Sequence, residues 1–153
     1  MSREELTFWM GRYEARFPTD RHYARNHMWA QQQAPSRWRF GFSAYAVRLL
    51  QDVYFLDWHL DAGAEVQQGQ QIGEIESSKA ESLLYAPVSG RLVQFNETLL
   101  EDPSLINVDG YHRGWLFEME SPHAEVLSPT QYLEHLAQSW KTAQRLIKGQ
   151  LNE

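Results

Sequence analysis

The chain of 153 residues contains no cysteine. Disulfide bonds and thiolate metal sites are therefore excluded, and cysteine usage gives no indication of the redox compartment. The sequence also has no apolar run approaching the roughly 18 residues that a membrane-spanning helix needs. Residues 1–5 lack the basic region, followed by an apolar one, of a secretory signal. We therefore expect a cytoplasmic protein that does not bind membranes.

Basic side chains are in the minority, with 14 Lys and Arg against 20 Asp and Glu, and the formal net charge is −6. This balance disfavours nucleic-acid binding, although the six Trp side chains could stack on bases. The sequence shows no carboxylate pair, nucleophile motif or phosphate-binding glycine loop. His22 and His27 do not have a recognised metal-ligand spacing. We expect a non-catalytic protein without a metal site.

Both ends of the chain carry patterns that favour helices. In residues 2–16, Ser2 and Glu5 have capping-box spacing. Ser128-Pro129 predicts the start of a second helix, because proline is favoured at the first helical position. We expect Trp9 and Trp140 to bury against the domain between the two helices. The apolar stripes at helical intervals are Leu6, Trp9, Met10 and Tyr13 in the first helix, and Tyr132, Leu133, Leu136, Trp140, Ala143 and Ile147 in the second.

Between these helices the chain has the pattern of a small β domain. Residues 43–50 suit one short helix, with Ser43 as its N-terminal cap. Residues 52–58 and 115–119 are rich in side chains that favour strands, and glycines punctuate the region between them. We predict three segments, namely an N-terminal helical extension over residues 1–20, a β domain over residues 21–120 and a C-terminal helical extension over residues 121–153.

Residues 76–82 form a polar stretch between two apolar runs, a pattern that predicts a β-hairpin. Ser77 and Ser78 favour a turn because their hydroxyls can bond neighbouring backbone groups. Lys79 would then stand at the tip of the hairpin, in solvent. Taken alone, an exposed lysine in a turn indicates no more than a solvated charge. Its role therefore depends on the rest of the chain.

An ordered set of residues extends on both sides of this hairpin. Its members are Tyr23, His27, Trp29, Phe40-Gly41, Tyr45-Ala46, Leu50, Asp52-Val53, Gly63, Gly69, Glu76-Ser77, Lys79-Ala80, Pro87-Val88-Ser89-Gly90, Asn96, Asp102-Pro103, Leu105, Asn107, Tyr111 and Gly114-Trp115. The set resembles the H protein family of the glycine cleavage system. This resemblance implies a mainly β fold, a barrel-sandwich hybrid of two sheets that is related to lipoyl and biotinyl domains.

The resemblance also implies a cofactor. In the H protein family, the lysine that matches Lys79 carries lipoic acid in amide linkage. Biotin carriers flank their lysine with methionines, whereas the neighbours here are Ser78 and Ala80. Lipoyl attachment is therefore the better interpretation. The protein would supply a rigid base and docking surfaces, and the covalent lipoic acid at Lys79 would supply the redox chemistry.

The residues next to Lys79 complete the expected cofactor site. Ser77 and Ala80 belong to the family's attachment motif. Glu76 and Glu81 flank the lysine, and their charges would suit recognition by the attaching enzyme, either a lipoate ligase or an octanoyl or lipoyl transferase. A purely solubilising role for the two carboxylates is equally consistent with the sequence.

Two positions depart from the family pattern where H proteins usually carry an acid. Met28 lies between the matching His and Trp, and Leu83 follows Lys79 by four residues. Acids at these positions are associated with holding a cationic aminomethyl group on the lipoyl arm, and neither apolar side chain can pair with a cation. A methionine suits a dithiolane instead. We expect Met28 and Leu83 to line the cleft where the arm rests.

These departures favour a sulfur-bearing cargo, as in the lipoate-binding proteins of bacterial sulfur oxidation, whose partner is a heterodisulfide-reductase-like complex. The alternative is a genuine H protein that carries the aminomethyl group between glycine decarboxylase, aminomethyltransferase and dihydrolipoyl dehydrogenase. In both cases the chain would be a non-catalytic carrier subunit. A third possibility is an interaction module whose lysine is never modified.

Overall fold

The structure, a computed structural model, describes residues 4–151 and the side chains of residues 4–144. Ser2 of the expected capping box and the side chain of Ile147 lie outside the described residues. The described strands and helices are, in chain order, β1 (Glu5–Met10), β2 (Tyr13–Pro18), β3 (His22–Tyr23), β4 (Met28–Ala34), β5 (Arg37–Phe42), α1 (Ala44–Leu50), β6 (Val53–Trp58), β7 (Glu65–Val66), β8 (Gln71–Ser77), β9 (Glu81–Tyr85), β10 (Gly90–Phe95), α2 (Thr98–Glu101), α3 (Leu105–Val108), β11 (Phe117–Glu120) and α4 (Pro129–Leu151).

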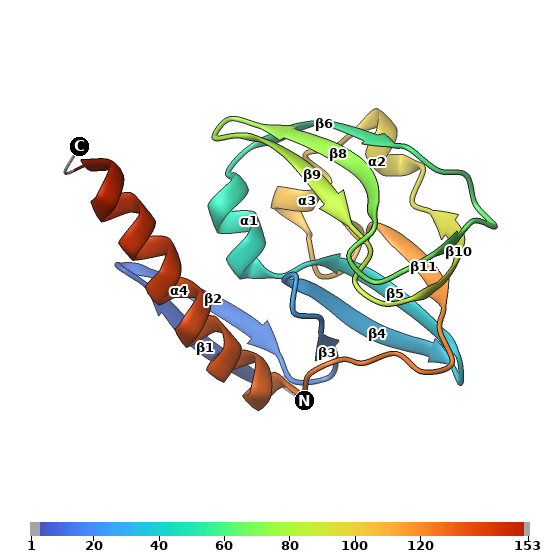
Figure 1. Ribbon diagram of the computed structural model, residues 1–153, viewed down its shortest axis with the longest axis horizontal. Helices are drawn as coiled ribbons and strands as arrows, with labels where there is room; N and C mark the ends of the chain where they lie inside the picture. The colour runs from blue at the N-terminus through green and yellow to red at the C-terminus, as the bar shows by residue number, and fades with distance from the viewer. Residues whose placement is uncertain (1–3, 152–153) are drawn as a thin grey trace.

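Two antiparallel sheets form the centre of the molecule (Figure 1). One has six strands in the order β3-β4-β5-β11-β10-β7, and the other has three in the order β6-β8-β9. Buried side chains alternate with less buried ones along residues 37–40 of β5 and 73–77 of β8, as the period of an extended chain requires. Phe40 and Phe117 from the larger sheet meet Leu56 and Ile75 from the smaller one in a single apolar core. The mainly β prediction is confirmed.

A second apolar cluster joins both ends of the chain to the sheets. Figure 1 shows α4 lying along the β1–β2 hairpin. Tyr132 of α4 stacks on Tyr23 with ring centroids 4.5 Å apart, and it meets Phe17 of β2 edge to face at 5.4 Å. Leu136 is also fully buried here. This cluster lies outside the barrel core, and in it the β1–β2 hairpin and α4 pack against each other and against the outside of the barrel.

The predicted N-terminal helix is wrong, because residues 5–18 form the β1–β2 hairpin. Its apolar residues also fit a period of two, and this period places Phe8 opposite Ala15 on the face toward α4. Gly11 has a φ of 65° at the first position of the turn, which suits a type II′ hairpin turn. The predicted burial of Trp9 is wrong as well, since this side chain lies on the opposite face and is 57% exposed.

The other predicted elements are present. Helix α1 begins after Ser43, whose hydroxyl accepts from the Ala46 N–H. Strand β6 and the hairpin of β8 and β9 form where the sequence predicts them. Helix α4 begins at Pro129, and Trp140 packs, partly buried, against the second cluster. Among residues 4–151, no helix is both long and apolar enough to cross a membrane.

Candidate functional site

Lys79 is an exposed residue in the turn between β8 and β9. The hydroxyl of Ser77, which is 5% exposed, shapes this turn. Its oxygen accepts from the backbone N–H groups of Lys79 at 3.4 Å and Ala80 at 3.3 Å, and it donates to the Ala80 carbonyl at 3.2 Å. The Ser77 N–H also donates to the Ala80 carbonyl. The backbone below the lysine is therefore closed by local hydrogen bonds, while the side chain extends outward.

Ser78 ties the same turn to the segment between α1 and β6. The Ser78 N–H donates to the Asp52 carbonyl at 2.8 Å, and the Asp52 N–H donates to the Ser78 hydroxyl at 3.1 Å. Asn107 holds that segment in turn, because its amide donates to the Gln51 carbonyl at 2.6 Å and its oxygen accepts from the Val53 N–H at 2.9 Å. The lysine turn is thus anchored to two further elements of the fold.

The anchoring by Asp52 and Asn107 was not predicted as part of the site. Both residues are members of the ordered set in the sequence, and that membership was the only signal that could have indicated them. Gln51, next to Asp52, has a φ of 62°, which is uncommon for a residue other than glycine. The bond from Asn107 to the Gln51 carbonyl stabilises this conformation.

The outer face of the hairpin is acidic beside the lysine. Glu76 and Glu81 are register partners directly below the turn, and Glu74 is paired with Leu83 further along. These side chains line a shallow hollow of about 240 Å³. Among the described residues, no carboxylate forms a salt bridge with Lys79. The ammonium group is therefore free for modification, with negative charge near its base.

The structure places Met28 and Leu83 in different surroundings. Met28 is 1% exposed and lies in the barrel core, opposite Phe42 across the β4–β5 ladder. Leu83 is 45% exposed on the outer face of β9. Leu83 shares its hollow with Glu76 and Glu81, whereas Met28 does not line that hollow. Contact of either side chain with a lipoyl arm stays a prediction.

His27, one of the histidines that the sequence singles out, has a packing role. Its Nδ1 lies 3.0 Å from the Tyr132 hydroxyl, which also lies 2.8 Å from the Ser43 hydroxyl. The His27 ring is stacked on His135 of α4 at 5.4 Å. Burial, together with the nearby His135, lowers the pKa of His27 to about 4. A neutral imidazole thus joins α4 to the barrel.

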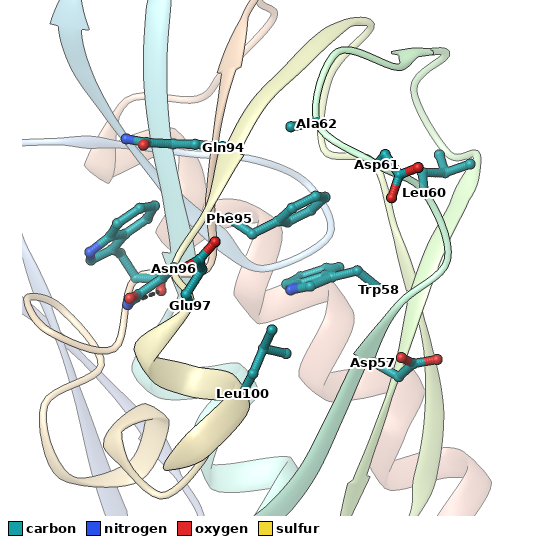
Figure 2. A pocket seen from close by; sticks show the side chains of 11 residues that line it. Asp57, Trp58, Leu60, Asp61, Ala62, Gln94, Phe95, Asn96, Glu97 and Leu100 are labelled. Carbon is teal, nitrogen blue, oxygen red and sulfur yellow. Dashed lines mark hydrogen bonds between the residues drawn. The ribbon is translucent and has the colours of Figure 1, made fainter.

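A larger hollow, of about 680 Å³, lies away from the lysine (Figure 2). Trp58 and Phe95 stack in it with ring centroids 4.8 Å apart, and Leu100 of α2 forms another wall. Trp58 pairs with Gly73, whereas Val53 at the other end of β6 pairs with Ser77 below the lysine turn. The lysine turn and the larger hollow therefore lie at opposite ends of β6, and the two hollows share no lining residue.

Comparison with known proteins agrees with this arrangement. The family model described as Glycine cleavage H-protein matches residues 21–145 of the chain. The chain belongs to this family. The glycine cleavage system H protein of Stenotrophomonas maltophilia is 37% identical over 123 residues, which cover 78% of this chain and 93% of that protein. The H protein of Alteromonas mediterranea is 40% identical over 107 residues, which cover 70% of this chain and 82% of that protein.

A solved structure of an H-family protein has the same fold. The crystal structure of a glycine cleavage system H protein from Mycobacterium marinum superposes with a TM-score of 0.70 and 32% sequence identity, and it covers 79% of this chain and 99% of that one. The prediction of a barrel-sandwich hybrid is therefore confirmed. The β1–β2 hairpin precedes residue 21 and lies outside the match to the family model.

Proposed function

We propose that Lys79 is the attachment point of a lipoyl group and that the chain is a non-catalytic carrier. The observation that supports this most directly is an exposed lysine on a turn that Ser77 and Ser78 pin on both sides, in a chain of the H-protein family. The lipoyl group, once attached, supplies a dithiolane that undergoes two-electron redox chemistry. The chain's own residues hold the base of the arm still and leave its far end free to reach partners.

The first candidate pathway is glycine cleavage. The relatives from Stenotrophomonas and Alteromonas and the Mycobacterium structure are all named as H proteins of that system. The partners would then be glycine decarboxylase, aminomethyltransferase and dihydrolipoyl dehydrogenase, together with a lipoate-attaching enzyme. The cargo would be a cationic aminomethyl group. Glu76 and Glu81 provide negative charge on the face next to the lysine.

The second candidate is the sulfur-bearing cargo that the sequence favoured, with a heterodisulfide-reductase-like partner. The comparisons do not support it, because the relatives described above are named for glycine cleavage. The observation that keeps it as a candidate is Leu83, an exposed apolar side chain on the face beside the lysine where H proteins usually carry an acid. An apolar surface is compatible with an uncharged sulfur cargo.

Lipoylation is tested by intact mass and peptide mapping after reaction with lipoate, ATP and a lipoate ligase. We expect one lipoyl group on the peptide that contains Lys79. The Lys79→Arg variant should keep its fold and accept none, while Lys141→Arg, which changes an exposed lysine of α4, should react like the unaltered chain. Modification of Lys79→Arg at the normal rate would overturn the assignment, and an unreactive but folded wild-type chain would favour the unmodified interaction module.

The cargo is tested by glycine–bicarbonate exchange with purified glycine decarboxylase and lipoylated protein. A glycine cleavage carrier should support exchange as well as an ordinary H protein does. A sulfur carrier should support it poorly, and Leu83→Asp should then raise the rate about tenfold or more, because a charge-assisted hydrogen bond contributes about 1.5–3 kcal/mol. Leu83→Asn is the matched control, since it has similar size and no charge. Met28→Glu is unsuitable, because it would bury an unpaired carboxylate in the core.

A further inference from the structure

Three metal-binding side chains meet on the outer face of the three-stranded sheet. Asp57 of β6 and Glu74 of β8 are direct register partners, so their carboxylates project from the same face. His59 follows Asp57 by two residues. The backbone N–H of His59 donates to the Ile72 carbonyl, and this bond holds the residue beside the β6–β8 ladder. Figure 2 shows the Asp57 carboxylate and the Trp58 ring leaving β6 in different directions, and Asp57 is also one of the residues that line the large hollow.

The distances between these groups are close to those of a metal site. Nε2 of His59 lies 3.8 Å from Oδ2 of Asp57 and 3.9 Å from Oε1 of Glu74. All three ligand atoms lie within 4.8 Å of one another. Bond lengths near 2.1 Å in a tetrahedral zinc site place ligand atoms about 3.4 Å apart. Small rotations of partly exposed side chains would therefore bring the three atoms to bonding distance of one ion.

The second ring nitrogen of His59 already has a partner. Nδ1 lies 3.1 Å from Nε2, the nitrogen of the Gln71 side-chain amide. The oxygen and nitrogen of an amide can exchange places by rotation, so the amide oxygen can accept from Nδ1–H. That arrangement leaves the lone pair of Nε2 directed toward Asp57 and Glu74. A hydrogen bond of this kind, from the far ring nitrogen, is what usually orients a metal-binding histidine.

We propose that Asp57, His59 and Glu74 bind a divalent transition-metal ion, with Zn²⁺ as the ion that suits them best. One imidazole nitrogen and two carboxylate oxygens would supply three ligands, and water would fill the fourth position. The imidazole disfavours Mg²⁺ and Ca²⁺, which prefer oxygen ligands, and Zn²⁺ stands above Mn²⁺ in affinity for such donors. The two carboxylates balance the charge of the ion.

Metal binding at this site does not require lipoyl attachment, and Glu74 is the one member of the triad that also lines the hollow beside the lysine. Glu74 lies five residues before Lys79, and no member of the triad contacts the lysine turn in the hydrogen bonds of that turn. The Lys79→Arg variant should therefore bind the ion like the unaltered chain. A chain that is never lipoylated should also bind it. Failure of the carrier proposal and failure of the metal proposal would thus be observed separately.

The test is isothermal titration of the untagged chain with ZnCl₂ at neutral pH. We expect one ion per chain, and we expect His59→Ala to weaken binding by more than tenfold. His123→Ala, which removes an exposed histidine outside the site, is the matched control and should bind normally. Gln71→Ala should weaken binding about tenfold, because loss of an outer-shell partner typically costs about 10–100-fold. Circular dichroism and melting temperature would check that each variant is folded.

Two results would overturn the site. One is the absence of one-to-one binding by the folded, unaltered chain, which would leave His59 as a partner of two carboxylates only. The other is equal affinity in His59→Ala and in the unaltered chain, which would place the ion elsewhere. Addition of Mg²⁺ in large excess should not displace Zn²⁺.

Discussion

At the scale of single residues, the Lys79 turn depends on the Ser77 hydroxyl. This one group makes three hydrogen bonds to the backbone of Lys79 and Ala80, and it is almost fully buried. Loss of the hydroxyl would leave the N–H groups of Lys79 and Ala80 to find water, whereas the Ala80 carbonyl would keep its bond from the Ser77 N–H. A buried group that loses its partner costs about 1–3 kcal/mol, and solvent at the tip should reduce this penalty.

Ser77→Ala should therefore lower the free energy of unfolding by about 1 kcal/mol and slow the lipoylation of Lys79. Urea unfolding and the initial rate with a lipoate ligase are the two measurements. Ser82→Ala, on the neighbouring strand, is the control, because Ser82 makes none of the hydrogen bonds that shape the turn. Equal decreases in the free energy of unfolding and in the lipoylation rate of the two variants would show that the Ser77 hydroxyl has no special part in the turn.

His27 makes stability depend on pH. Burial and His135 lower its pKa to about 4, and the Tyr45 and Tyr132 rings also pack on it. The unfolded chain takes up a proton near the ordinary pKa of about 6.5, which the folded chain resists. The unfolded state therefore binds more protons between these two values, and folding stability falls as the pH drops through this window.

The expected loss between pH 7 and pH 4 is up to about 3 kcal/mol, since one pKa unit corresponds to about 1.4 kcal/mol. His27→Asn should flatten this part of the pH profile while keeping the left-handed backbone, because His27 has a φ of 72° and asparagine tolerates that conformation. The profile is measured by urea unfolding at several pH values. The exposed His123→Asn is the control, and identical slopes in all three proteins would contradict the assignment.

At the scale of secondary-structure elements, the β1–β2 hairpin has two faces of opposite character. Phe17 is fully buried against Tyr23 and Tyr132, and Ala15 and Met10 lie on the same side. Trp9 pairs with Glu14 on the other side and is mostly exposed. A strand directs alternate side chains to opposite faces. Phe17 can therefore stabilise the packing of α4, whereas Trp9 cannot.

Phe17→Ala should thus lower the free energy of unfolding by about 3–5 kcal/mol, the usual range for a fully buried phenylalanine. Trp9→Ala should change it by less than about 0.5 kcal/mol, as for most surface substitutions. Chemical denaturation of both variants gives the comparison. A helix over residues 2–16 with Trp9 buried would produce the reverse order, so the pair tests the hairpin directly.

At the scale of the whole molecule, two apolar clusters divide the fold. The barrel core draws no side chain from residues 4–20, and its first member along the chain is Ala24. The second cluster contains Met10, Ala15 and Phe17 from the hairpin together with Tyr132 and Leu136 from α4. The Tyr23 hydroxyl also donates a hydrogen bond to the Pro18 carbonyl of the hairpin. The hairpin therefore packs against α4 and against the outside of the barrel, and it takes no part in the barrel core.

Deletion of residues 1–19 should lower the melting temperature and leave the barrel able to accept a lipoyl group at Lys79. Loss of Phe17 burial alone should cost about 3 kcal/mol or more. Thermal unfolding measures the first effect, and intact mass after reaction with a lipoate ligase measures the second. A shortened chain that melts like the full one, or a folded one that is not lipoylated, would contradict this division of the molecule.

Short-range signals in the sequence predicted the lysine turn and the starts of two helices. Two serines and a lysine between apolar runs predicted the turn, Ser43 predicted the start of α1, and Ser128-Pro129 predicted the start of α4. Each prediction depends on how a few neighbouring residues satisfy the backbone, so no distant contact is needed. The ordered set of residues along the chain added the family and its fold.

Other features depended on tertiary structure. Leu6, Met10 and Tyr13 fit a helical spacing, whereas Leu6, Phe8 and Met10 fit a strand, and packing against Tyr132 decides between the two. The burial of Met28 and the meeting of Asp57 with Glu74 both depend on strand register, which a slip of one residue would reverse. Register results from contacts between residues far apart in the chain, and for this reason the sequence alone predicted the lysine turn but not the Asp57–His59–Glu74 triad.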